Sequence, residues 1–176
     1  MKNFAAPTTE PGNSLRPELN IVGKMEPLCS GICGYEWAPH FSEWEQLAST
    51  YNRLLVVASR DSGKSTLFSK LLPIIHVIMR PGVEIQIVSY SEDQVIRIIS
   101  GIKDLFESKP IIRDLIPSGD KDWSKTALQF KNGARIDSLT FGSSGRGRHV
   151  DLLLVDDATK DFSGMNADDQ EQYFLR

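Results

Sequence analysis

Apolar residues along the chain form short runs and helical stripes, separated by turns that contain glycine or proline. The run from Leu54 to Ala58 and a second run from Val83 to Ser89 predict buried β-strands. Between them, Lys64 to about Arg80 is apolar on almost every side, which predicts a helix buried between other layers. Pro73 lies inside this segment, and we expect it to kink or shorten the helix.

Two further helices carry start signals in the sequence. Ser42, with Glu45 three residues later, fits a capping box at the start of a short amphipathic helix. Ser91 with Gln94 fits a second capping box, which opens a helix that extends to about Ser108. Strands that alternate with helices in this way predict a three-layer α/β domain with a mostly parallel sheet.

The second half of the chain adds a hairpin and a glycine-rich loop. Asn132 and Gly133 lie between two segments of alternating polarity, which is the strongest short-range signal for an antiparallel hairpin. The segment from Phe141 to Val150, FGSSGRGRHV, is polar, basic and rich in glycine. It precedes Leu152 to Val155, a short apolar run that predicts a strand ending in two acidic residues.

Composition narrows the class of protein. The chain has 176 residues, of which 40% are hydrophobic and 24% charged, and these values suit one soluble globular domain. The formal net charge of −3 lacks the basic excess that a dedicated duplex-DNA binder usually carries. No apolar run is long enough to span a bilayer, and the first residues lack the apolar core of a signal peptide.

The N-terminal part of the chain gives weaker signals than the rest. We expect residues 1–34 to be a mobile arm, because its first part is rich in Pro, Thr, Asn and Gly without periodicity, and residues 35–176 to form the domain. Cys29 and Cys33, together with His40, are candidates for part of a zinc site. Their spacing is not that of a standard zinc motif and a fourth ligand is not evident, so two unpaired thiols are the favoured interpretation.

Residues 58–66 carry the main candidate chemistry. Ala58, Gly63, Lys64 and Ser65 fit the phosphate-loop pattern G-x-x-x-x-G-K-[ST], except that Ala58 replaces the first glycine. Gly63 would let the backbone approach a phosphate, and N–H groups at the helix start would bind its charge. Lys64 would reach the β- and γ-phosphates of ATP, while Ser65 would hold Mg²⁺; the alternative is a chance Gly-Lys-Ser sequence. The predicted nucleotide-binding residues of the loop are Ala58, Ser59, Arg60, Asp61, Ser62, Gly63, Lys64, Ser65 and Thr66.

The acids after the last predicted strand supply a second half for this site. Four apolar residues followed by Asp156 and Asp157 are typical of a Walker B element. Asp156 would accept from the water shell of Mg²⁺ or from Ser65, and Asp157 would orient the water that attacks the γ-phosphate. A parallel sheet would bring the tip of this strand beside the phosphate loop. Taken alone, such a pair of aspartates often only caps the next turn.

Aromatic residues before the loop are candidates for a base pocket. Trp37, Phe41 and Trp44 are candidates to stack on adenine, and Gln46 is a candidate to hydrogen-bond its edge. The alternative is that these aromatic side chains belong to the core, which is the usual location of tryptophan.

Two arginines are candidates to stabilise a transferring phosphoryl group. Arg60 lies inside the phosphate loop, and Arg146 lies between two glycines shortly before Asp156. An arginine placed on the transferred group, in cis or from a neighbouring subunit, contributes roughly 10³- to 10⁵-fold in rate. A solvated basic loop, or a contact to nucleic-acid phosphates by Arg146 and Arg148, is the alternative.

Together these features resemble the ATPase part of a phage terminase large subunit, the motor that packages viral DNA. The resemblance covers about Tyr35 to Arg176 and rests on the arginine-containing phosphate loop, the hairpin, the Arg146 loop and the strand that ends in the two acids. It implies that Arg60 senses or contacts the nucleotide and that Arg146 is an arginine finger acting in trans. Many members have Glu where this chain has Asp157, so the water-orienting role is assigned less firmly than the metal role of Asp156.

The resemblance also implies an architecture and partners. The fold would be a three-layer P-loop NTPase of the additional-strand type, incomplete at the C-terminus, because the family continues with more of the sheet, a lid and a nuclease domain. The cofactors would be ATP and Mg²⁺, and the partners double-stranded DNA, the procapsid portal, a small terminase subunit and further copies in a ring. We expect the isolated chain to be monomeric, to lack nuclease activity, and to act in the host cytoplasm, transiently at the portal.

Two other functions remain open on the sequence. A P-loop helicase or another DNA-dependent ATPase would also bind ATP, although no further helicase motifs are found. A nucleotide-binding assembly or regulatory module that does not hydrolyse ATP would bind Mg·ATP and release no phosphate.

Overall fold

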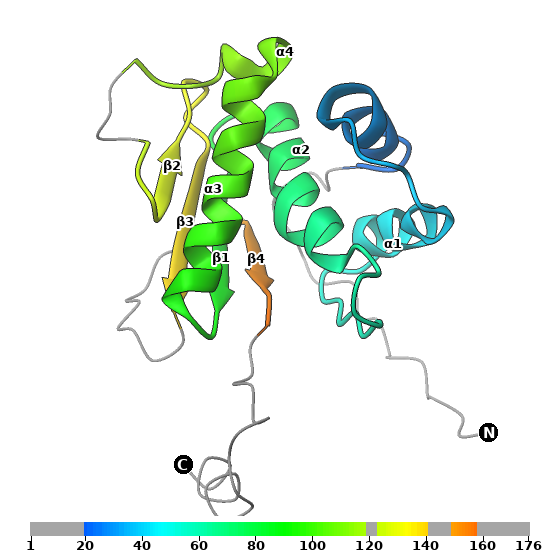
Figure 1. Cartoon of the computed structure of the whole chain (residues 1–176). Helices are drawn as coiled ribbons and strands as arrows, with labels where there is room; N and C mark the ends of the chain where they lie inside the picture. Colours follow the sequence, from blue (N-terminus) through cyan, green and yellow to red (C-terminus); the bar gives the residue numbers. More distant parts are fainter. Residues whose placement is uncertain (1–19, 119–122, 141–148, 158–176) are drawn as a thin grey trace, which may run out of the picture.

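The computed structural model describes residues 20–118, 123–140 and 149–157, and in them four strands form one mixed sheet (Figure 1). In sequence order the strands are β1 (Glu84–Ser89), β2 (Ala127–Gln129), β3 (Arg135–Thr140) and β4 (Leu152–Val155). Their order across the sheet is β2-β3-β1-β4. β1 pairs in parallel with both β3 and β4, and β2 pairs antiparallel with β3. The α/β class, the mostly parallel sheet and the antiparallel hairpin are therefore confirmed.

Helices precede and connect these strands. They are the π-helix η1 (Pro27–Cys33), α1 (Pro39–Thr50), the π-helix η2 (Ser65–Leu71), α2 (Leu72–Met79), α3 (Glu92–Ser108) and the short α4 (Pro110–Arg113). None of the helices in the described ranges combines the length and the apolar character needed to cross a lipid bilayer. The long apolar helix that the sequence predicts is present as η2 followed by α2, and it changes from π to α geometry one residue before Pro73.

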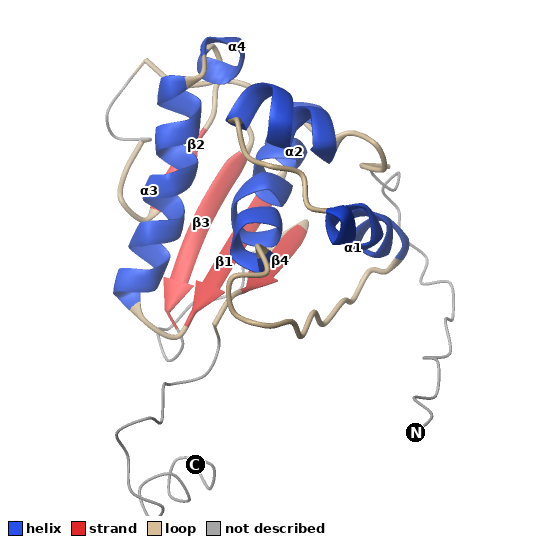
Figure 2. Ribbon diagram, turned by 45° about the vertical axis from the view of Figure 1, so that its right-hand side comes forward, coloured by secondary structure: helices blue, strands red, loops and turns tan. Residues whose placement is uncertain are grey.

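The helices lie on one side of the sheet in both views (Figures 1 and 2). The side chains of β1 alternate accordingly: Ile85 and Ile87 are buried, whereas Gln86 and Val88 are only half-buried. The described residues thus form two layers. The third layer of the predicted architecture is not found among them.

The segment from Leu54 to Ala58 is not a buried strand, and that prediction is wrong. It has no strand pairing, and the side chains of Leu55 and Val57 are each 87% exposed. Apolar residues favour burial, but a strand also needs a neighbour for its backbone N–H and C=O groups. β4 is the edge strand on this side, and no described segment pairs with its outer edge.

The two predicted capping boxes have different outcomes. Ser91 caps α3 as expected, because its side chain accepts from the N–H of Gln94 at 3.2 Å. Ser42 does not cap α1, which begins three residues earlier at Pro39. The fixed φ of proline suits the first turn of a helix and sets the earlier start. The hydroxyl of Ser42 instead accepts from the indole N–H of Trp37 at 3.0 Å.

Glu45, the other half of the predicted box, anchors α1 to the segment that precedes η1. It is 4% exposed, and its carboxylate accepts from three consecutive backbone N–H groups. The donors are Gly23 at 2.9 Å, Lys24 at 3.1 Å and Met25 at 2.8 Å. Such charge-assisted bonds are stronger than neutral ones, and the bond to Met25 satisfies a backbone donor of a buried residue.

We expect Glu45→Ala to lower the free energy of unfolding by about 3 kcal/mol, because it removes three charge-assisted bonds and leaves the N–H of the buried residue Met25 without this acceptor. The measurement is urea unfolding followed by circular dichroism. Glu43→Ala is the matched control, since Glu43 is exposed on the same helix. Equal unfolding midpoints for the two variants would contradict the anchoring role.

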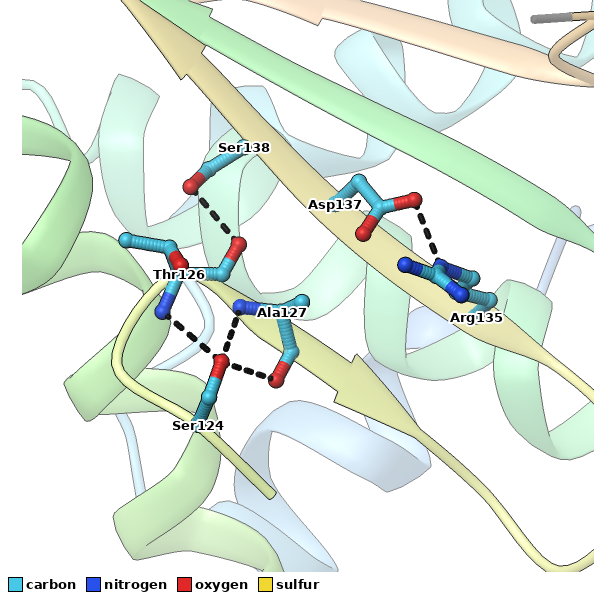
Figure 3. Close-up of polar contacts among 6 residues, drawn as sticks. All are labelled: Ser124, Thr126, Ala127, Arg135, Asp137 and Ser138. Atoms are coloured by element: carbon cyan, nitrogen blue, oxygen red, sulfur yellow. Dashed lines mark hydrogen bonds and ion pairs between the residues drawn. The ribbon is translucent and has the colours of Figure 1, made fainter. Parts of the chain in front are cut away.

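The predicted hairpin is confirmed, and polar contacts secure both of its ends. At the turn, Gly133 has a φ of +81°, and the side-chain amide of Asn132 donates to the Val77 carbonyl at the end of α2 at 2.7 Å. At the other end, Ser138 Oγ donates to the Thr126 carbonyl at 2.8 Å (Figure 3). These contacts fix the register of β2 on β3 and attach the hairpin to the helical layer.

One ion pair lies along β3 in the same view. Arg135 Nε and Asp137 Oδ2 are 2.6 Å apart (Figure 3). Residues two apart on a strand point to the same face. Both side chains are half-buried, on the face of the sheet away from the helices.

Candidate functional site

The candidate phosphate-loop residues form a compact turn between the extended segment and η2. Asp61 and Gly63 both have left-handed backbone conformations, with φ of 60° and 82°. The Ser62 hydroxyl donates to the Ser59 carbonyl at 2.8 Å and closes the turn. Aspartate is one of the few residues other than glycine that adopt this conformation readily, which explains its presence in the loop.

Lys64 lies across its own loop. Its ammonium Nζ donates to the carbonyl oxygen of Ala58 at 2.5 Å, and the side chain is half-buried. The cation therefore closes the loop between its first residue and the start of the helix. Ser65, the predicted metal ligand, is the exposed first residue of η2, and Thr66 beside it is half-buried.

Asp156 joins the acidic end of β4 to the helix that follows the loop. Its Oδ2 accepts from Ser69 Oγ at 2.6 Å, across 87 positions of sequence. The sequence predicted that Asp156 accepts from the water shell of Mg²⁺ or from Ser65, and the protein partner in the structure is Ser69, about one helical turn further along η2. The sequence contained a signal for Ser69, because it is a small polar residue in a segment that is apolar on almost every side. In the structure Ser69 is 3% exposed, and a buried hydroxyl needs a hydrogen-bond partner.

Asp157 lies just beyond the carboxyl end of β4, next to the carboxyl end of the parallel strand β1. Its carbonyl accepts from the N–H of Tyr90 at 3.2 Å, and the N–H of Asp156 donates to Val88 at 2.9 Å. The backbone of Asp157 is left-handed, with φ of 51°, and the residue is exposed. Both acids therefore lie at the carboxyl ends of parallel strands, the location expected of a ligand site in an open α/β sheet.

The candidate base-pocket aromatics pack against one another and against η2. Phe41 lies 5.8 Å from Trp44 between ring centroids, and Trp44 lies 5.6 Å from Phe68 of η2. Trp37 makes an edge contact with Phe41 at 5.4 Å. Trp44 is half-buried and Gln46 exposed, and residues two apart on a helix do not share a face, so α1 does not bring these two together.

Of the two candidate arginines, Arg60 lies within the described residues and Arg146 does not. Arg60 is exposed in the phosphate loop. Arg146, together with Arg148, lies outside the described residues, and its role as a finger stays a prediction.

The cysteines are not assembled into a metal site. Cys29 and Cys33 are both buried and free. Burial raises the pKa of Cys33 to about 11 and that of Cys29 above its usual value, so both are thiols at neutral pH. His40 contacts Ser62 instead, and the described ranges hold no group of three or more His, Cys, Asp or Glu residues that could bind a metal ion.

Comparisons of the chain with known protein families, with curated proteins and with solved structures found no match.

Proposed function

We propose that the chain is the ATP-hydrolysing motor domain of a viral DNA-packaging terminase large subunit. The observation that carries this proposal is the hydrogen bond between Ser69 and Asp156. It joins the helix after the phosphate-loop sequence to the strand that ends in two acids. The helix that follows the loop sequence and the acidic end of β4, which lie about half of the chain apart in sequence, are therefore in contact.

Each residue of the proposed site has a separate task. The loop N–H groups and Lys64 would bind the phosphates, and Asp157 would orient the attacking water. Ser65 and Asp156 offer oxygen ligands of the kind that Mg²⁺ prefers, and Asp156 retains a carboxylate oxygen beyond the one that Ser69 occupies. The ion, when bound, would neutralise charge on the phosphates. Arg60 and Arg146 would stabilise charge on the transferred group.

A second candidate is a nucleotide-binding module that does not hydrolyse ATP. The segment before the loop favours this candidate. Leu54 to Ala58 does not pair with the sheet, so the sheet does not fix the position of the loop on its N-terminal side. Such a chain would bind Mg·ATP and release no phosphate.

Calorimetric titration with Mg·ATP, combined with an assay of phosphate release, separates these functions. Binding with turnover, stimulated by double-stranded DNA, is expected for a motor domain or another DNA-dependent ATPase. Because a finger that acts in trans has no partner site in a monomer, the second candidate is supported only if binding without turnover persists when double-stranded DNA, procapsids with their portal and the small subunit are all present. An absence of Mg·ATP binding would contradict both proposed functions. Procapsids with their portal and the small subunit are the further additions that distinguish a packaging motor from a helicase.

We expect Ser69→Ala to weaken Mg²⁺-dependent ATP binding by about tenfold, because Asp156 loses the bond that orients it. Isothermal titration with and without Mg²⁺ measures the effect. Ser49→Ala is the control, since the Ser49 hydroxyl is buried with no hydrogen-bond partner among the described residues. If both variants bind Mg·ATP as the unmodified chain does, Ser69 does not position Asp156.

A further inference from the structure

Helix α1 contacts the phosphate loop through two neighbouring side chains. His40 Nε2 lies 2.8 Å from the carbonyl oxygen of Ser62. A carbonyl oxygen only accepts, so the ring nitrogen is the donor in this contact. The ring of Phe41 lies over the next residue, Gly63, where an added Cβ would come within 2.5 Å of Phe41 Cζ. α1 thus contacts both residues of the peptide that joins Ser62 to Gly63.

The two contacts determine which way this peptide faces. In a planar trans peptide, the C=O and N–H groups point in opposite directions. Because the C=O of Ser62 points toward His40, the N–H of Gly63 points away from α1. The buried ring of Phe41 occupies the α1 side of Gly63, which leaves the opposite side for a ligand. The N–H donor is therefore directed to the side from which an anion can approach.

Aromatic contacts extend this support to the helix after the loop. The ring of His40 meets Trp44 edge-on, with centroids 4.6 Å apart. Trp44 also contacts Phe68 of η2. α1 therefore contacts a residue that precedes Gly63 in the sequence, Ser62, and one that follows it, Phe68. α1 is itself anchored by the buried carboxylate of Glu45. The support is thus continuous from residues 23–25 to the loop.

We propose that α1 sets the conformation of the phosphate loop, and that His40 is a positioning residue that turns the Ser62–Gly63 peptide so that the Gly63 N–H faces a bound phosphate. The inference rests on the proposed nucleotide site for the identity of the ligand. The contact between His40 and the loop is independent of that function. His40 itself is exposed, so a substitution there leaves the core of the domain intact.

The test compares two substitutions of His40 in the full 176-residue chain. His40→Gln keeps an N–H donor at the end of the side chain, and His40→Leu keeps similar bulk without a donor. Glu43→Leu is the control for a new apolar side chain on the exposed surface of α1. Two quantities are measured: the rate of trypsin cleavage after Arg60 or Lys64 without nucleotide, and the dissociation constant for Mg·ATP. Thermal unfolding verifies that each variant is folded.

We expect His40→Leu to be cleaved in the loop roughly fivefold faster than the unmodified chain and to bind Mg·ATP roughly fivefold more weakly, with an unchanged unfolding midpoint. His40→Gln is expected to stay within about twofold of the unmodified chain in both quantities. Equal impairment of the two variants, or unmodified behaviour of His40→Leu, would overturn the proposal. If the unmodified chain binds no ATP, the nucleotide site is refuted, and the cleavage rates alone still decide whether His40 holds the loop.

Discussion

Lys64→Ala is expected to weaken ATP binding by roughly 10- to 100-fold, the loss of one or two charge-assisted hydrogen bonds, and to abolish turnover. Lys64 is the cation of the proposed phosphate loop, and its Nζ already donates to the Ala58 carbonyl within that loop. Bound phosphates would attract the same ammonium. The side chain contributes charge rather than packing, so the fold is expected to persist.

Titration calorimetry and phosphate release measure these effects, and circular dichroism verifies the fold. Lys131→Ala is a matched control, because Lys131 is an exposed lysine on the hairpin turn, outside the candidate site. Lys64→Ala also removes the bond to Ala58, so a part of the loss could come from a loosened loop. Faster trypsin cleavage after Arg60 in this variant would reveal that part. Unchanged ATP affinity in Lys64→Ala would refute the phosphate-loop assignment.

The elements that could be predicted from sequence are those whose signals are local. Ser91 caps α3 through a residue three positions away, and the Asn132–Gly133 turn sets its own backbone geometry. β4 follows from four consecutive apolar residues that end at two acids. Each of these signals needs only its immediate neighbours, so the sequence contains all the information required.

Apart from the Ser42 cap, which the nearby Pro39 displaces, the wrong or missed predictions discussed next depend on partners far along the chain. Leu54 to Ala58 has the composition of a strand, but no described segment pairs with it. Glu45 fits a capping box, yet its carboxylate binds backbone N–H groups about twenty positions earlier. The contacts of Ser69 with Asp156 and of His40 with Ser62 likewise join segments whose proximity only the fold establishes. A spacing rule within one segment cannot supply these contacts.

The two acids at the end of β4 differ in conformation, and this determines which substitutions can separate their roles. Asp157 has a φ of 51°, which asparagine tolerates and which alanine would strain. Asp156 accepts from the buried hydroxyl of Ser69, and asparagine keeps an oxygen for that bond while it removes the charge. Asparagine is therefore the appropriate substitution at both positions, with Asp156→Ala as the more severe loss.

Asp156→Asn is expected to lose most of the Mg²⁺ dependence of ATP binding, because a neutral amide is a poor ligand for this cation. Asp157→Asn is expected to keep Mg·ATP affinity, or to strengthen it by removing a negative charge near the triphosphate, and to lower turnover by roughly 10²- to 10⁴-fold. Titrations with and without Mg²⁺ give the first quantity, and phosphate release gives the second. Asp157→Gly is the control for the backbone, since glycine accepts the same φ without a carboxylate. If Asp157→Gly and Asp157→Asn lose turnover equally, the carboxylate is required. Equal effects of the Asp156 and Asp157 substitutions on Mg·ATP affinity would contradict the division of roles.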